Sequence, residues 1–305
     1  RYWKTYQLRS QHKARLEAEL KRLHADITVS VWRQEASFLP DLKDGSRKIL
    51  ELHTSKFAPV RMYPVGSKLK RQFGHLRVAI QERVAARYDR FVILTHEEKP
   101  FWKGFSNLSV IPNPLSFNSQ KRADATAHRV MIAGRMEYVK NFPELLQIWA
   151  RVAPDFPDWQ LHIYGDGWML DALKNKADVL GIAPQVIFEG AVSDMETAYA
   201  SSSIYVMTSH FEGLPMVLIE AQSVGLPAVS YMCSSGPRDI ITDGKDGFLV
   251  ELYDQETFAE RLRTLMQDEE LRRSMGQAAE VASHRYDLDV IMPQWLSLFN
   301  ELSAS

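Results

Sequence analysis

Several features that would restrict the class of this protein are missing from its sequence. The 305 residues contain one cysteine, Cys233, which excludes an internal disulfide and a cysteine-rich zinc site. No apolar run approaches the roughly 18 residues needed to cross a bilayer, and no signal-peptide core is present. This cysteine usage is typical of a reducing compartment, so we expect a cytoplasmic protein. The chain opens at Arg1 and not at methionine, from which we expect an internal start with sequence missing upstream.

The composition that is present is ordinary for a globular protein, with 45% hydrophobic, 25% charged and 10% aromatic residues. This mix excludes a disordered chain and a fibrous repeat. At about 150 residues per domain, the length predicts two domains.

The net charge of −1 hides a strong asymmetry. Residues 1–110 contain 22 Lys and Arg against 11 Asp and Glu, whereas residues 111–305 contain 15 against 27. A basic half beside an acidic half suggests that one half meets an anionic surface or ligand. A basic face that is simply solvated explains the same counts, and both readings stay open.

The first part of the chain predicts a parallel α/β sheet, because short β-branched runs alternate with helical stretches. We expect a helix over residues 3–24, a basic loop at 68–71 and a further helix to about residue 88. Strands are expected at residues 26–32, 47–53, 90–95 and 108–112. Four strands are few for such a domain, so residues 1–114 predict an incomplete Rossmann-like domain. Residues 115–127 are polar and aperiodic and predict a linker.

The second part predicts a complete doubly wound domain over residues 128–288. Its six strands are expected at residues 129–133, 160–164, 186–188, 204–208, 228–231 and 248–250. Helices are expected between them, at residues 141–153, 168–180, 194–201, 214–225 and 255–267. Residues 289–305 predict a final helix that is apolar on one side, and we expect it to pack back on the first domain.

The turn after the first strand of the second domain carries two cations. Open α/β sheets bind ligands at the carboxyl ends of their strands. Arg135 leaves the strand and Lys140 enters the next helix, so both can meet above one strand end. A guanidinium fork and an ammonium point charge together suit a diphosphate. Taken alone, charged residues in such a turn are more often merely solvated.

The segment 209–221 (SHFEGLPMVLIEA) predicts an anion site at a helix start. It follows a strand, turns at Gly213 and enters a helix with Pro215 near the first position, where proline is tolerated. The backbone N–H groups of about Met216 to Leu218 are then free, and the positive end of the helix dipole favours an anion there.

Two glutamates of the same segment predict contacts to hydroxyl groups. Glu212 lies in the turn and Glu220 lies on the helix. A carboxylate near a phosphate site is favourable when it accepts hydrogen bonds from the hydroxyls of a sugar or a ribose. The alternative makes Glu212 a turn residue and Glu220 a surface residue, but Glu220 stands in an apolar stretch.

The spacing of these glutamates, with Gly134-Arg135 and Lys140-Asn141 upstream, resembles the retaining family-4 glycosyltransferases of GT-B fold. The resemblance covers residues 128–252 and includes the turn YGDG at 164–167 and the stretch SGPRDII at 235–241. In that family, two Rossmann-like domains face each other across a cleft. The C-terminal domain holds a nucleotide sugar and the N-terminal domain holds the acceptor.

The resemblance implies a role for each matching residue. Arg135 and Lys140 would bind the diphosphate and stabilise it as a leaving group, without a metal or another cofactor. Glu212 would contact the donor sugar, as would His53, which resembles the family's cleft histidine. Backbone N–H groups between Gly213 and Val217 would face the phosphate and sugar, and Glu220 would bind the ribose. The implied donor and nucleotide residues are Gly134, Gly165, Asp166, Gly190, Ala191, Val192, Gly213, Leu214, Pro215, Met216, Val217 and Glu220.

The implied function is transfer of a hexose or N-acetylhexosamine, with retention, from a nucleotide diphosphate sugar to a saccharide or lipid-linked acceptor. The products would be surface polysaccharides, namely capsule, exopolysaccharide or lipopolysaccharide. The turn SSGP at 234–237 resembles that of transferases using UDP-sugars, which favours UDP over GDP. A non-catalytic sugar-nucleotide-binding module and a nucleotide-sugar epimerase of the same architecture are the alternatives.

The basic N-terminal half suggests a further partner. Residues 1–24 hold seven Lys and Arg against two acidic residues, and Lys68, Lys70 and Arg71 form a second basic group. Each such cation contributes about 1 kcal/mol at an anionic membrane surface. We therefore expect peripheral docking on the inner face of the cell membrane. Nucleic acid is not expected, because no aromatic and basic interleaving or known binding motif is present.

Overall fold

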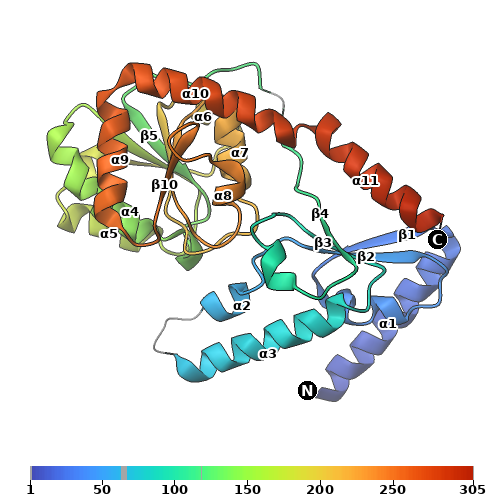
Figure 1. Cartoon of the computed structure of the whole chain (residues 1–305). Helices are drawn as coiled ribbons and strands as arrows, with labels where there is room; N and C mark the ends of the chain where they lie inside the picture. The colour runs from blue at the N-terminus through green and yellow to red at the C-terminus, as the bar shows by residue number, and fades with distance from the viewer. Residues whose placement is uncertain (1, 63–66, 118, 305) are drawn as a thin grey trace. The chain divides into compact units, whose positions relative to one another are not determined.

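The computed structural model describes residues 2–62, 67–117 and 119–304 (Figure 1). Two compact units make up the chain. Unit 1 consists of Arg1–Pro112 and Ile291–Ser305, and unit 2 is Asn113–Val290.

Unit 1 contains a four-stranded sheet in which all neighbouring strands are parallel and follow the order of the chain. Its strands are β1 (Ile27–Val31), β2 (Arg47–Leu52), β3 (Arg90–Ile93) and β4 (Leu108–Val110). Its helices are α1 (Tyr2–Leu23), α2 (Ala58–Arg61), α3 (Lys68–Ala85) and the greater part of α11 (Leu288–Ser303). The α/β class expected for this part is confirmed. The expected basic loop at 68–71 is wrong, because these residues form the first turn of α3.

Both faces of the unit 1 sheet are covered, as the two-residue period of a strand requires in a parallel sheet. Leu50 and Leu52 of β2 pack into one apolar cluster, together with Trp102. Ile49 lies in a second cluster, in which the buried residues of α11 are Ile291, Leu298 and Leu302. The C-terminal helix thus buries its apolar side on this sheet.

Unit 2 is a six-stranded parallel sheet with the order β10-β9-β8-β5-β6-β7. The strands are β5 (Arg129–Ala133), β6 (Gln160–Tyr164), β7 (Val186–Gly190), β8 (Ile204–Met207), β9 (Ala228–Tyr231) and β10 (Gly247–Val250). This is the doubly wound order, in which the chain reverses its direction of winding between β5 and β8. The doubly wound fold class expected for this part of the chain is confirmed.

Unit 2 contains seven α-helices in its described residues, and three of them begin with an aspartate N-cap. The seven helices are α4 (Phe142–Val152), α5 (Leu170–Val179), α6 (Met195–Ala200), α7 (Met216–Ser223), α8 (Pro237–Ile240), α9 (Gln255–Gln267) and α10 (Glu269–Ser283). Asp194, Asp254 and Asp268 cap α6, α9 and α10, each accepting a hydrogen bond from a backbone N–H three residues on.

The described residues of the segment 115–127, predicted as a linker, belong to unit 2 and form hydrogen bonds within it. The Asp124 N–H donates to the Ala200 carbonyl at 2.8 Å, and the Ser203 hydroxyl donates to the Asp124 carbonyl at 2.7 Å. Of the helices in the described ranges, none has the length and apolar character that a bilayer crossing needs.

The close packing of α10 on the end of α7 depends on a glycine in each segment. A Cβ added at Gly276 would lie 2.2 Å from the carbonyl oxygen of Gly225, a distance that real Cβ contacts do not show. Gly225 has a φ of +75° directly after α7.

We expect Gly276→Ala to lower the free energy of unfolding by about 1–3 kcal/mol through overpacking. Helix propensity alone would act in the opposite direction, by up to about 1 kcal/mol. Urea denaturation measures the sign, with Gln277→Ala on the exposed side of the same helix as control. An alanine variant at least as stable as the native chain would contradict the contact.

Candidate functional site

The carboxyl ends of β5, β6 and β7 form one continuous edge. The Gly134 N–H donates to the Tyr164 carbonyl at 3.0 Å, and the Gly165 N–H donates to the Gly190 carbonyl at 2.7 Å. A Cβ at Gly165 would lie 2.2 Å from the Gly134 oxygen, and its φ of +119° also requires glycine. The structure therefore brings together three of the predicted nucleotide-binding glycines, Gly134, Gly165 and Gly190, at one edge of the sheet.

The loop after β8 is bound to the loop after β5. The His210 N–H donates to the Val139 carbonyl at 2.8 Å, and the Thr208 hydroxyl donates to the Lys140 carbonyl at 3.2 Å. Between the same loops, Lys140 Nζ lies 2.8 Å from Glu212 Oε1, with 21% and 13% of the two side chains exposed. Two predicted site residues 72 positions apart thus form an ion pair largely shielded from water, where charges interact more strongly than on the surface.

Arg135 has a different environment from Lys140. Its side chain is 78% exposed, and its guanidinium donates to Glu137 Oε1 at 3.2 Å. The guanidinium therefore lies on the solvent side of the same loop, beside a carboxylate that partly balances its charge. Its contact with a diphosphate stays a prediction.

The start of α7 offers fewer free amides than the sequence suggested. The Leu218 N–H donates to the Pro215 carbonyl at 2.9 Å, so the expectation of a free amide at Leu218 is wrong. Pro215 has no N–H to offer. The amides that an anion can still use at this helix start are those of Met216 and Val217, whose side chains are half-buried.

The turn that leads into α7, with Gly213 and Leu214, is held from the other side by the loop after β9. The Glu212 N–H donates to the Ser234 carbonyl at 3.1 Å. A Cβ at Gly236 would lie 2.3 Å from Pro215 Cδ and 3.1 Å from the Gly213 oxygen, at a φ of +102°. Glycine at position 236 therefore lets the two loops touch and keeps the helix start in place.

Glu220 lies on α7 with both carboxylate oxygens engaged. Oε1 accepts from the Ser116 hydroxyl at 3.1 Å, and Oε2 accepts from the Tyr199 hydroxyl at 2.8 Å. Burial raises the pKa of Tyr199 well above its ordinary value, so its hydroxyl stays a donor. Sequence reasoning missed Ser116 and Tyr199, because the former was assigned to a linker and the latter lies within an ordinary amphipathic helix.

His210 is a second residue that sequence reasoning missed. Its ring lies 4.5 Å from that of Tyr138, between centroids, and the Tyr253 hydroxyl is 3.1 Å from its Nδ1. Burial lowers the pKa of His210 despite the opposing charge of Glu144, so the imidazole is neutral at pH 7. Its place in the turn directly after a strand was the available signal.

The remaining predicted residues show no specific site geometry. The carbonyl of Asp166 accepts from the Met136 N–H at 2.7 Å while its side chain is exposed, as are Ala191 and Val192 after β7. His53 follows β2 in unit 1, with Nε2 at 2.5 Å from Glu51 Oε2 and 41% of its side chain exposed. The roles of these four residues stay predictions.

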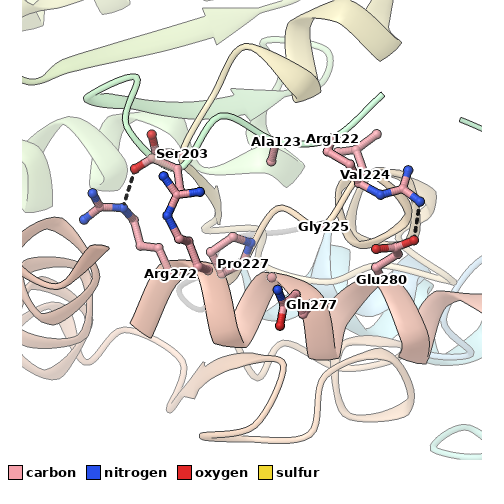
Figure 2. Close-up of a pocket in the computed structure, with 12 residues that line it drawn as sticks. Arg122, Ala123, Ser203, Val224, Gly225, Pro227, Arg272, Gln277 and Glu280 are labelled. Atoms are coloured by element: carbon pink, nitrogen blue, oxygen red, sulfur yellow. Dashed lines mark hydrogen bonds and ion pairs between the residues drawn. The ribbon is translucent and has the colours of Figure 1, made fainter. Parts of the chain in front are cut away.

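A cavity of about 330 Å³ lies at the opposite edge of the unit 2 sheet, next to Ser203 and Pro227, which precede β8 and β9 (Figure 2). Arg272 lines it but donates to the carbonyls of Ala125, Leu265 and Met266. Arg122 pairs with Glu280. Both arginines thus have partners within the protein. The cavity also lies at the amino ends of the strands, whereas such sheets bind ligands at the carboxyl ends. We assign the cavity no ligand.

The two parallel sheets and the site at the carboxyl edge of the second define a GT-B protein, which is the fold class expected from the sequence. The solved structure of HepE from Anabaena, in complex with UDP and glucose, has a TM-score of 0.77 and 18% identity, covering 94% of this chain and 81% of that one.

The profile described as "Glycosyl transferases group 1" matches residues 117–281, more than half of the chain. The chain belongs to this family. It is 36% identical over 220 residues to an exopolysaccharide phosphotransferase of Streptomyces coelicolor, covering 70% of this chain and 23% of that protein. It is 35% identical over 222 residues to the amylovoran biosynthesis glycosyltransferase AmsD of Erwinia amylovora, covering 70% and 62%. The chain thus spans less than two thirds of either relative.

The shielding of the Lys140–Glu212 pair is tested by a double-mutant cycle. With Lys140→Met and Glu212→Gln, urea denaturation of the four proteins gives the coupling free energy, which we expect at about 1–2 kcal/mol for groups in contact. The matched control is the exposed Arg135–Glu137 pair, tested with Arg135→Met and Glu137→Gln. Its coupling free energy should be about a few tenths of a kcal/mol, as is usual for exposed ion pairs. Equal coupling in both cycles would contradict the expected difference.

Proposed function

We propose that this chain forms the donor-binding part of a retaining family-4 glycosyltransferase. In this proposal, it transfers a hexose or N-acetylhexosamine from a UDP-sugar to a saccharide or lipid-linked acceptor, in the synthesis of a surface polysaccharide. The observation that carries the proposal is the Lys140–Glu212 pair, which links the loop after β5 to the turn before α7. The polysaccharide named for the Erwinia relative, and the UDP in the HepE crystal, support the acceptor and donor classes.

The chemistry follows from the charges that develop during transfer. Breaking the bond between sugar and phosphate leaves negative charge on the diphosphate and positive charge on the anomeric carbon. Lys140, Arg135 and the amides of Met216 and Val217 would stabilise the departing anion, a preorganised electrostatic role. Because these groups supply positive charge, we propose that no divalent metal is needed.

Glu212 would contact both Lys140 and the donor sugar. Its carboxylate lies 2.8 Å from Lys140 Nζ, and a second lone pair can accept a hydrogen bond from a donor-sugar hydroxyl. Lys140 would then share its charge between Glu212 and the diphosphate. Glu220 would bind the ribose, and His53 would assist at the donor sugar. Retention would follow from attack on the face that the phosphate leaves, with that phosphate taking the acceptor proton.

The proposed setting is cytoplasmic, where nucleotide sugars would be the donors, with peripheral association at the inner face of the membrane. The basic residues of unit 1 support this setting. We expect the acceptor to be recognised largely outside unit 2.

Nucleotide binding is tested by thermal unfolding of the chain with UDP, GDP, ADP and their sugars. A ligand at 100 times its dissociation constant adds about 2.7 kcal/mol of stability. We expect the largest shift with UDP or a UDP-sugar. Two product assays then separate the alternatives. With the donor alone, conversion to an epimer indicates an epimerase. With donor and acceptor together, binding of the donor without transfer indicates a binding module. Equal shifts with all nucleotides, or none, would count against the UDP proposal.

We expect Lys140→Ala and Arg135→Ala each to lower turnover about 10²-fold, the scale of losing one donor to a developing oxyanion. Release of UDP from the donor in the presence of acceptor measures turnover. Lys174→Ala, on the exposed surface of α5, is the control and should leave turnover unchanged. Near-native turnover in both site variants would defeat the assignment of the cations.

A further inference from the structure

Helix α3 carries an apolar stripe on the side that faces away from the protein. Leu69, Phe73, Leu76 and Ile80 have 76%, 65%, 56% and 47% of their surfaces exposed. Their spacing of four, three and four residues places them on one line along the helix. Large apolar side chains exposed singly are ordinary, but a continuous row of four marks an interaction surface.

The opposite side of α3 is the one that packs on the protein. Gly74, Val78 and Gln81 are buried. A Cβ at Gly74 would lie 2.6 Å from the Pro59 oxygen and 2.7 Å from Val60 Cα, so only glycine lets α2 approach this closely. The helix is therefore held by its small-residue side, and the apolar stripe is directed outward by the packing of unit 1 itself.

The stripe is bordered by positive charge. By helical periodicity, Lys70 and Arg77 lie along one side of it, and Lys68 and Arg83 lie toward the other. In the described part of the chain, no carboxylate pairs with these four cations. Glu82, the helix's one acidic residue, is 2.6 Å from the buried Lys56 Nζ, so it does not neutralise the border.

An exposed apolar row between unpaired cations fits one kind of partner. An anionic bilayer offers acyl chains to the apolar side chains and headgroup charge to the lysines and arginines, as for helices that lie in the membrane interface. Helix α1 is also basic, and its Lys21 and Arg22 pair with Glu17 and Glu19. Among the side chains described in α1, however, Leu23 is the one large apolar group that is exposed, so α1 shows no apolar row. The charge and the apolar surface coincide on α3.

We propose that α3 is a membrane-docking helix, which inserts Leu69, Phe73, Leu76 and Ile80 into a bilayer surface carrying anionic headgroups. The inference extends the proposed function, because a lipid-linked acceptor would be met at such a surface. Its test reads lipid binding and not transfer.

The test is cosedimentation of the chain with vesicles of phosphatidylcholine alone or mixed with phosphatidylglycerol. We expect binding to the mixed vesicles and little to the neutral ones. Phe73→Ser with Leu76→Ser should weaken binding at least tenfold, because both substitutions remove apolar surface that the bilayer would bury. Lys70→Glu with Arg77→Glu should weaken it at least tenfold as well, at about fivefold for each cation removed.

Matched controls come from exposed positions of unit 2. Val179→Ser with Val281→Ser removes two apolar groups that are more exposed than Phe73 and Leu76, and Lys174→Glu with Lys245→Glu reverses two exposed charges. Both control variants should bind vesicles like the native chain. All variants should keep the native thermal shift with UDP, so that a failure of lipid binding is distinguishable from a failure of the donor proposal.

Three outcomes would overturn the proposal. The native chain fails to bind the mixed vesicles, the α3 variants bind as well as the controls, or sedimentation velocity shows a dimer that is lost in Phe73→Ser with Leu76→Ser. The last result would assign the stripe to a second copy of the chain.

Discussion

The pairing of β5 with β8 is the constraint on which the candidate site depends. Val130 is opposite Ile204 and Met131 is opposite Tyr205, although more than 70 residues separate the two strands. Because both strands point the same way, their carboxyl ends meet, and the loops that follow them lie side by side. The ion pair between Lys140 and Glu212 is a direct consequence of this adjacency.

Close backbone approach is the second requirement of the site. Gly165 and Gly236 stand where a Cβ would collide with neighbouring loops, at Gly134 and at Pro215. These contacts bring together the loops after β5 and β6, and the loops after β8 and β9, without large side chains between them. A ligand there would meet backbone amides and a few fixed charges, which is how an anion is bound in an α/β sheet.

Three charged side chains of the candidate site have partners within the protein. Lys140 faces Glu212, Arg135 faces Glu137, and Glu220 accepts two hydroxyl hydrogen bonds. A cation held by a carboxylate is kept in position and need not be ordered again when a substrate arrives. In unit 1, by contrast, no carboxylate within the described ranges pairs with the cations that border the α3 stripe, so their charge is left toward solvent.

The sequence by itself determined the elements and their class. The strands of unit 2 were predicted within two residues, because buried parallel strands are short apolar runs between helical periods. It also predicted which residues lie at the carboxyl edge of the unit 2 sheet, since Gly, Lys and Glu residues that follow a strand can be found from the sequence. Two local predictions were wrong. The Leu218 amide is hydrogen-bonded and not free, and residues 68–71 form the first turn of a helix and not a loop.

Only the tertiary structure decided which of these residues meet and which surfaces stay open. No spacing rule relates Ser116 and Tyr199 to Glu220, because their contact exists only after three separate segments fold together. The sequence shows that α3 has apolar residues at helical spacing, a pattern that ordinarily predicts a buried face. The structure shows that Gly74 sets the opposite side against α2, so the apolar row is left exposed. The choice between two faces of one helix is made by packing, which depends on long-range contacts that a linear pattern does not contain.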